Sequence, residues 1–200
     1  MKTGILAAAI GLVLAGGALA QTAPPTRIRG TIAALDGLAL TIATREGSSV
    51  KVMLDDKYTV AAPRKLTFAD VKPNSYIGTA AVTAADGTLT ALEVVVIPEA
   101  GRGNGDGHYA WDLAPGSTMT NGNVDAVVEA NAGRMLTLSY KGGSVKVTVP
   151  ENVPIVAFGP AERSDLKVGA RVFVAAGKAA DGSFTASRVL VEKDGVAPPI

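Results

Sequence analysis

An internal repeat constrains the fold of this chain more than any other feature. The segment AADGTLTA at 84–91 recurs 95 residues later as AADGSFTA at 179–186, and SVKV at 49–52 recurs at the same spacing at 144–147. Several matches at one spacing and in one order indicate a duplicated structural unit. We therefore expect two similar domains joined by a linker.

Each repeat has the pattern of short β-strands. Hydrophobic residues alternate with polar ones from Arg27 onward, and Asp-Gly pairs mark tight turns between such runs. Pro63 and Pro73 bracket a segment that can form one or two helical turns, with Leu66 and Val71 as its inward anchors. Three strands, a helical connection and two more strands are typical of an OB-type Greek-key barrel.

The predicted fold class is therefore all-β, with one short helix per repeat. We expect two tandem five-stranded OB-like Greek-key barrels, the first at residues 27–97 and the second at residues 120–192.

Three motifs of the repeat carry a family resemblance. These are a G-x-(I/V) first strand, the Asp165–Gly169 segment DLKVG before the fourth strand, and the A-x-D-G-x-(L/F)-x-A hairpin. With them the chain resembles an uncharacterised family of exported bacterial domains, a domain of unknown function. The linker segment HYAWDLAPGSTMTN is also similar to one in two-repeat members. The resemblance implies tandem OB-type barrels and export, and it implies no reaction. The first repeat departs from it at Asn74, where the second has Gly169.

The chain ends are expected to lie outside the barrels. Residues 1–20 have the positive start, apolar run and Ala-Leu-Ala end of a secretory signal peptide, with an uncleaved anchor as the alternative. Residues 21–26 are predicted to be a mobile lead-in and residues 193–200 a disordered tail. After cleavage no long apolar segment remains, so we expect a periplasmic protein that does not span the membrane.

Composition disfavours several classes of function. The formal net charge is +1, from 19 basic and 18 acidic residues, so no strong field would attract nucleic acid. The basic pair Arg27 and Arg29 is interpreted as solvated surface. Cysteine is absent, which excludes disulfides and thiol chemistry. One histidine, His108, without a nucleophile-elbow motif near Ser117, predicts that the protein is not an enzyme.

The linker at residues 98–119 is the most unusual stretch. Its first part is rich in glycine, and its second part holds the only tryptophan, Trp111. A flexible spacer would lack large apolar groups, so we expect residues 108–120 to be ordered between the barrels. The predicted contacts for a ligand or partner are Tyr109, Trp111, Asp112 and Met119.

A divalent metal is an alternative ligand for the same stretch. Asp106, His108 and Asp112 lie close together in sequence among glycines, and carboxylates with an imidazole are common transition-metal ligands. A single imidazole makes a weak site, so a plain connector remains the main alternative. No cofactor is otherwise expected.

These observations predict a non-enzymatic periplasmic binding or interaction protein. Its partner would be a small molecule, a cell-envelope component or another protein, held near the linker between the barrels. Two alternatives remain open: a divalent-metal binding or delivery protein using Asp106, His108 and Asp112, and a structural envelope protein with no small ligand.

Overall fold

The computed structural model describes residues 24–85, 87–130 and 133–199. The predicted signal peptide, the first half of the predicted lead-in and the final residue, Ile200, lie outside this described part. Within it the chain is mostly β-structure. The strands are β1 (Thr26–Asp36), β2 (Ala39–Thr44), β3 (Ser49–Lys65), β4 (Tyr76–Thr83), β5 (Leu89–Ala91), β6 (Val94–Ile97), β7 (Gly107–Ala110), β8 (Thr118–Ala130), β9 (Gly133–Tyr140), β10 (Gly143–Thr148), β11 (Ile155–Ala161), β12 (Arg171–Lys178) and β13 (Phe184–Val191).

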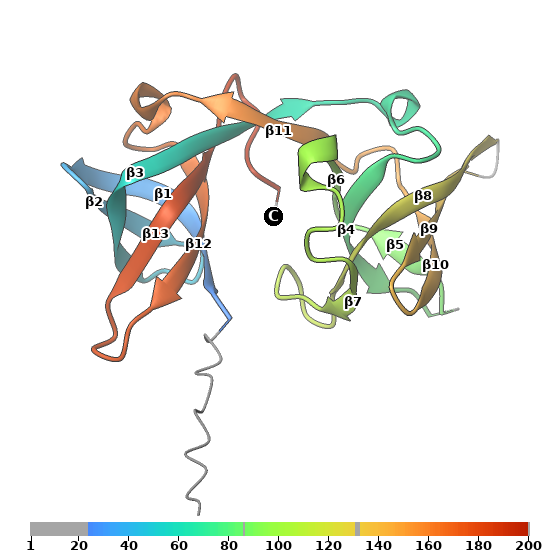
Figure 1. Cartoon of the computed structure of the whole chain (residues 1–200), viewed down its shortest axis with the longest axis horizontal. Helices are drawn as coiled ribbons and strands as arrows, with labels where there is room; N and C mark the ends of the chain where they lie inside the picture. The colour runs from blue at the N-terminus through green and yellow to red at the C-terminus, as the bar shows by residue number, and fades with distance from the viewer. Residues whose placement is uncertain (1–23, 86, 131–132, 200) are drawn as a thin grey trace, which may run out of the picture.

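The strands form two closed rings that lie side by side (Figure 1). In the first, which we call barrel A, β1 pairs with β2 and β12, β2 with β3, and β13 closes the ring between β12 and β3. In the second, barrel B, β4 pairs with β5 and β8, β8 with β9, β9 with β10, and β10 with β5. Each ring therefore has five strands and no open edge.

Each barrel combines strands from both sequence repeats. Barrel A takes β1–β3 from the first repeat and β12–β13 from the second, whereas barrel B takes β8–β10 from the second and β4–β5 from the first. The sequence predicted that residues 27–97 and 120–192 would each close on themselves, and the strand pairing corrects this. The two repeats have exchanged their last strands within one chain.

The physical reason for the exchange lies in β3. β3 continues for 17 residues, past Asp55 and Asp56, and its last part leaves barrel A. Its last part pairs antiparallel with β11, from Val60 opposite Ala161 to Lys65 opposite Val156. Figure 1 shows this two-stranded bridge running across the top of both barrels.

Each barrel encloses its own hydrophobic core, and both cores draw on both repeats. In barrel A, Ile32, Leu40 and Ile42 pack with Val174 and Val189. In barrel B, Ile77 and Val94 pack with Val124, Leu136 and Leu138. Burial of these side chains therefore stabilises the exchanged arrangement directly.

The expected short helix is reduced to a single 3-10 turn in each repeat, and the described residues contain no α-helix. Arg64 and Lys65, the first two residues of the segment predicted to be helical, belong to β3 instead. The turn η1 (Phe68–Asp70) is closed by Asp70, whose carboxylate accepts a hydrogen bond of 2.8 Å from the Thr67 backbone. In η3 (Arg163–Asp165), Asp165 does the same for the Glu162 backbone at 2.9 Å. The repeated aspartate thus caps a turn rather than a helix.

Asn74 and Gly169, the position where the two repeats differ, share the same backbone conformation. Asn74 has a φ of 69° and Gly169 a φ of 87°, a left-handed conformation that asparagine tolerates better than most residues. The backbone amide of Asn74 donates to the Val124 carbonyl at 2.8 Å, and that of Gly169 donates to the Ile32 carbonyl at the same distance. Both bonds join the turn before the fourth strand of one repeat to the first strand of the other.

A second matched pair of positions requires glycine for close approach. A Cβ at Gly30 would collide with the carbonyl oxygen of Ala43, and a Cβ at Gly122 with that of Ser139. Both lie in the first strand of a repeat, against its second strand. The G-x-(I/V) motif of the repeat is therefore a packing requirement of each barrel.

The C-terminal tail is more ordered than the sequence predicts. Backbone hydrogen bonds join Lys193 and Val196 in a tight turn, and the Lys193 ammonium lies 2.8 Å from the Asp165 carboxylate. Figure 1 shows the described end of the chain, up to residue 199, between the two barrels. Residues 193–199 therefore do not form the disordered tail that we expected.

Candidate functional site

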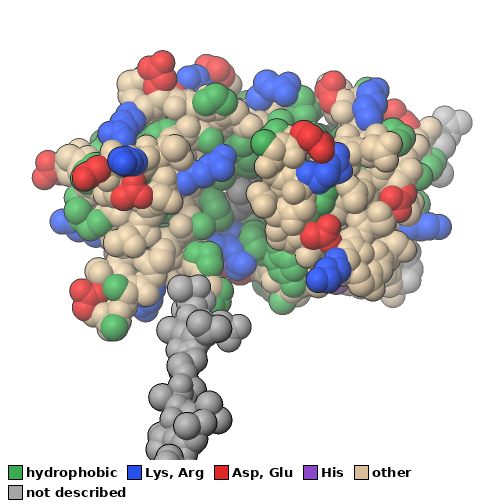
Figure 2. Space-filling view, in the orientation of Figure 1, with side chains coloured by type: hydrophobic (Ala, Val, Ile, Leu, Met, Phe, Trp, Pro, Cys, Tyr) green, Lys and Arg blue, Asp and Glu red, His purple; other side chains and the backbone are tan. Residues whose placement is uncertain are grey.

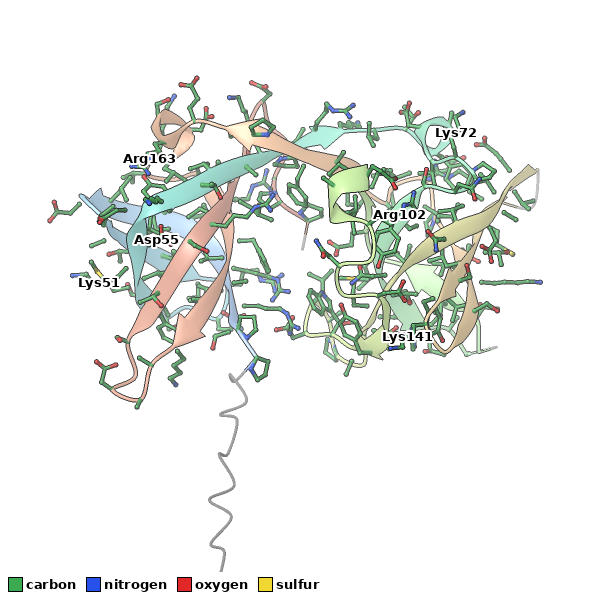
Figure 3. All side chains as sticks on the ribbon, viewed as in Figure 1. Lys51, Asp55, Lys72, Arg102, Lys141 and Arg163 are labelled. Atoms are coloured by element: carbon green, nitrogen blue, oxygen red, sulfur yellow. The ribbon has the colours of Figure 1, made fainter. Side chains whose placement is uncertain are left out.

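The linker between the repeats forms part of barrel B and reaches toward barrel A. It begins with the 3-10 turn η2 (Glu99–Gly101), which is followed by Arg102, labelled in Figure 3. The Arg102 guanidinium binds the Glu99 carboxylate at 2.6 Å and the Asn74 carbonyl at 2.8 Å. Strand β7 then pairs with β8 as a hairpin. The connection is therefore a built element of the fold.

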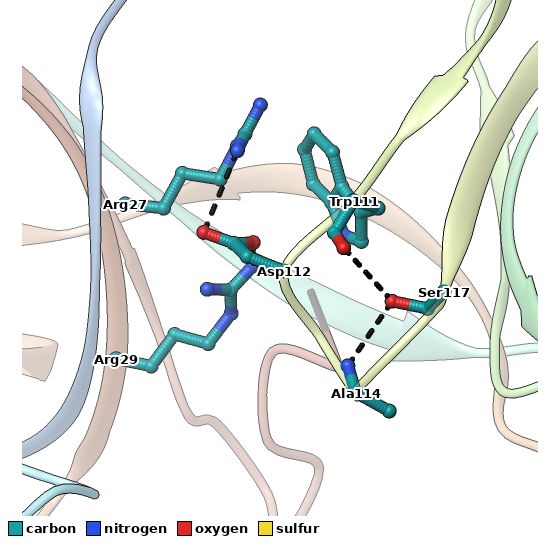
Figure 4. A network of polar contacts seen from close by, with 6 residues as sticks. All are labelled: Arg27, Arg29, Trp111, Asp112, Ala114 and Ser117. Atoms are coloured by element: carbon teal, nitrogen blue, oxygen red, sulfur yellow. Dashed lines mark hydrogen bonds and ion pairs between the residues drawn. The ribbon is translucent and has the colours of Figure 1, made fainter.

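The loop at residues 111–117, between β7 and β8, is held by its own hydrogen bonds. The Trp111 backbone amide donates to the Ser117 carbonyl at 2.8 Å, and the Ser117 hydroxyl donates to the Trp111 carbonyl at 3.1 Å. The Ala114 amide donates to the same hydroxyl at 3.1 Å (Figure 4). These bonds present Trp111 and Asp112 toward barrel A.

Arg27 and Arg29 of β1 contact this loop. The Arg27 guanidinium lies 3.7 Å from the centre of the Trp111 ring, as in a cation–π contact. The Asp112 carboxylate lies 3.4 Å from Arg27 and accepts a hydrogen bond of 2.9 Å from Arg29 (Figure 4). Burial works against ionisation of Asp112, but the Arg29 and Arg27 guanidinium groups hold its pKa below the usual value. The loop is thus fixed across the junction of the barrels.

Two ionisable side chains, Arg29 and Glu93, are buried at this junction. The Arg29 side chain is only 7% exposed, and its Nε atom has no hydrogen-bond partner among the described residues. The Glu93 side chain is fully buried, and neither carboxyl oxygen has a partner there. Burial raises the pKa of Glu93 to about 8, with Arg29 opposing the rise. At neutral pH Glu93 therefore carries little charge.

A cleft of about 690 Å³ lies between the two barrels. Figure 2 shows hydrophobic and basic side chains gathered where the barrels meet. Tyr109, Trp111 and Met119 come from the linker hairpin, and Phe158 comes from the bridge. The complete lining is Pro25, Arg27, Gly78, Val95, Val96, Ile97, Pro98, Gly101, Asn104, Tyr109, Trp111, Met119, Asn121, Phe158, Phe173, Ala175, Ser187, Arg188 and Leu190.

The structure brings three of the four predicted contact residues into this cleft. Tyr109, Trp111 and Met119 line it, and the Tyr109 and Trp111 rings meet edge to face at 6.1 Å. The Tyr109 hydroxyl accepts a hydrogen bond of 2.7 Å from Asn121. Asp112 does not line the cleft, because its carboxylate is turned to Arg27 and Arg29. Asp112 thus positions Trp111.

The three predicted metal ligands each have a different partner. Asp106 accepts a hydrogen bond of 2.6 Å from the Lys141 backbone amide. His108 shares a hydrogen bond of 2.8 Å with the Thr120 hydroxyl and stacks on Tyr140 at 5.8 Å. Asp112 faces two guanidinium groups, which repel a cation. Over the part of the chain that the structure describes, no three acidic, histidine or cysteine side chains gather as metal ligands.

Several residues of the junction were not singled out from the sequence. Arg29 was interpreted as solvated surface, yet it is buried against Asp112 and lies 5.1 Å from the Phe173 ring. Glu93 and Arg188 occupy equivalent positions of the two repeats, 95 residues apart, with opposite charge. That reversal within a duplicated segment was a signal that could have marked both positions.

No protein-family model, curated protein or solved structure matches the chain. The resemblance of the repeats to exported tandem barrels therefore stays a prediction. Among the helices of the described residues, none has the length and apolar character needed to cross a membrane.

Proposed function

We propose that the chain is a non-enzymatic binding protein of the periplasm and that its ligand lies in the cleft between the two barrels. One observation carries this proposal: a cleft of about 690 Å³ whose wall includes the ordered linker residue Trp111. Export rests on the signal-peptide pattern of residues 1–20.

The size and lining of the cleft support a small organic ligand. Ligand sites are concave, have volumes of roughly 300–1,000 Å³, and are mostly apolar with a few polar groups. The cleft falls within that range and combines aromatic side chains with a few amides and guanidinium groups. It also lies between two domains, where binding sites are frequent.

We further propose that both rings are OB-type Greek-key barrels. Around barrel A the strand order is β1-β2-β3-β13-β12, and around barrel B it is β8-β9-β10-β5-β4. In both rings the first three strands of one repeat are followed by the fifth and then the fourth strand of the other. Barrels of this type bind ligands through surface loops and one sheet face. Here that role would fall to the faces that the two barrels turn toward each other.

The hydrogen bonds of the linker support binding rather than catalysis. His108 is engaged by Thr120, and the Ser117 hydroxyl bonds within its own loop. A nucleophile and base acting together would need to lie within hydrogen-bond reach of each other. Because His108 and Ser117 bond to different partners, a role in holding the linker in place is favoured for both side chains.

Fluorescence of the mature chain, residues 21–200, tests the proposal, because Trp111 is the only tryptophan. A panel of organic acids, cell-wall saccharides and divalent metals is titrated while the emission is recorded. We expect one class of organic ligand to shift the emission. Calorimetry should then show that Trp111→Ala weakens binding at least tenfold while circular dichroism shows both barrels still folded. Val168→Ala, at a residue 71% exposed and away from the cleft, is the control.

The other outcomes identify the alternatives. A melting shift with a metal that His108→Ala abolishes would replace the proposal with metal binding. Emission that ignores every additive would replace it with a structural role.

A further inference from the structure

The junction of the barrels holds more basic than acidic charge. Three guanidinium groups lie there: Arg27 and Arg188 line the cleft, and Arg29 is buried behind Asp112. Asp112 is the only carboxylate bonded to any of them among the described residues. Because Glu93 carries little charge at neutral pH, it does not offset the excess.

Arg188 is the basic group of the cleft that is free to bind. It lies on β13 beside Thr59 of β3 and is exposed. Its guanidinium has no ion pair, hydrogen bond or ring contact with any residue that the structure describes. Arg27, by contrast, already contacts Trp111 and Asp112. An anion that enters the cleft would therefore meet Arg188 as an unpaired donor.

The walls beside Arg188 are apolar. Phe173 and Leu190 of barrel A lie in the same lining as Met119 and Val95 of barrel B. No acidic side chain occurs in that lining among the described residues. A molecule held there would bury apolar surface on both sides and place one end at a guanidinium group.

We infer that the ligand of this cleft is an organic anion, with an apolar body between the two barrels and a carboxylate bound by Arg188. This inference rests on the proposed function and adds the class of ligand. The planar guanidinium group matches a carboxylate with two parallel hydrogen bonds. A cationic ligand with the same body would be repelled by Arg188 and Arg27.

Three compounds with one bicyclic body separate charge from shape: naphthoate, naphthylmethanol and naphthylmethylamine. Each is titrated into the mature chain by calorimetry at low salt. We expect naphthoate to bind about tenfold or more tightly than the alcohol, as for a charge-assisted hydrogen bond. The amine should bind most weakly. Octanoate and octanol are compared in the same way, to test whether a ligand with an aliphatic body binds as tightly as one with an aromatic body.

Arg188→Gln and Arg64→Gln form a matched pair of variants. Arg64 is an exposed arginine of β3 outside the cleft lining, so its substitution changes net charge equally. We expect Arg188→Gln to remove the preference for naphthoate over naphthylmethanol and leave binding of the alcohol unchanged. Arg64→Gln should preserve the preference.

The outcomes separate this inference from the proposed function. If the alcohol binds as tightly as naphthoate and Arg188→Gln has no effect, the anion inference is wrong and the binding cleft stands. If none of the aromatic or aliphatic compounds binds, the anion inference is wrong, and the proposed function fails as well only if the Trp111 emission also ignores the saccharides of the wider panel. If naphthoate binds and both variants weaken it equally, the interaction is one of net charge and the role of Arg188 is refuted.

Discussion

Cutting the chain in the linker should leave the two halves bound together. A protease site inserted between Gly103 and Asn104, both exposed, separates the two sequence repeats. Because barrel A needs β12–β13 and barrel B needs β4–β5, each fragment holds strands that complete the other. Self-closed repeats would instead be joined only by the cut segment.

The burial in the two cores sets the magnitude of this effect. Large side chains of the second repeat in the core of barrel A are Leu166, Val172, Val174, Val189 and Val191. Those of the first repeat in the core of barrel B are Phe68, Val71, Ile77, Leu89 and Val94. At roughly 1.5–3 kcal/mol for each buried side chain, each barrel would lose about 10 kcal/mol if the fragments separated. The sum exceeds the roughly 4–15 kcal/mol that association costs.

Native size-exclusion chromatography with light scattering after complete cleavage is the assay. The expected result is one peak with the mass of the intact chain and an unchanged circular dichroism spectrum. The uncut insertion variant is the control for the inserted site. Two separate folded fragments, each with half the mass, would refute the exchanged strand pairing.

Three further substitutions test individual contacts. Gly30→Ala should lower the free energy of unfolding by about 2 kcal/mol in urea titrations, whereas Gly159→Ala, where a Cβ meets no atom, should change it by less than about 0.5 kcal/mol. Glu93 has a folded pKa of about 8 against an ordinary value of 4.5, so stability should fall as the pH rises between these values. Glu93→Gln should abolish that slope, which amounts to a loss on the order of 4 kcal/mol, and an unchanged slope would contradict the assignment. Asp112→Asn should shift the Trp111 emission to the red by freeing the loop and lower the free energy of unfolding by about 1–3 kcal/mol, because the buried Arg29 guanidinium loses its counter-ion. An emission identical to that of the parent chain would show that Asp112 does not hold the loop.

The local elements were predictable from the sequence because their signals are local. Alternation around Leu40 and Ile42 indicated a strand that buries both, and the structure places both in the core of barrel A. The Asp-Gly pair at 36–37 likewise marks the turn between β1 and β2. The prediction of mostly β-structure is confirmed, including a closed five-stranded barrel.

The strand partners were not predictable in the same way. Alternation indicates which side chains face a core, but not which core. Since the two repeats are similar, β12–β13 fit the first three strands of either repeat. The choice follows from the course of β3, which no short motif encodes. The helical segment predicted between Pro63 and Pro73 is shorter than expected for the same reason, because its first two residues, Arg64 and Lys65, pair with β11.

The candidate site was partly predictable. Trp111 stood out because a large apolar group is costly to expose in a linker. Arg29 did not, because its burial depends on Asp112, 83 residues away in sequence. Arg188 belongs to the cleft only through the strand exchange, which brings β13 beside the linker hairpin.

Intermolecular nuclear Overhauser effects test the central claim, a ligand held between the two barrels, most directly. Naphthoate bound to the mature chain should show contacts to the Met119 methyl group of barrel B and to the Leu190 methyl groups of barrel A in the same complex, because both side chains line the cleft. Contacts confined to one barrel, or to a surface outside the cleft, would contradict the account.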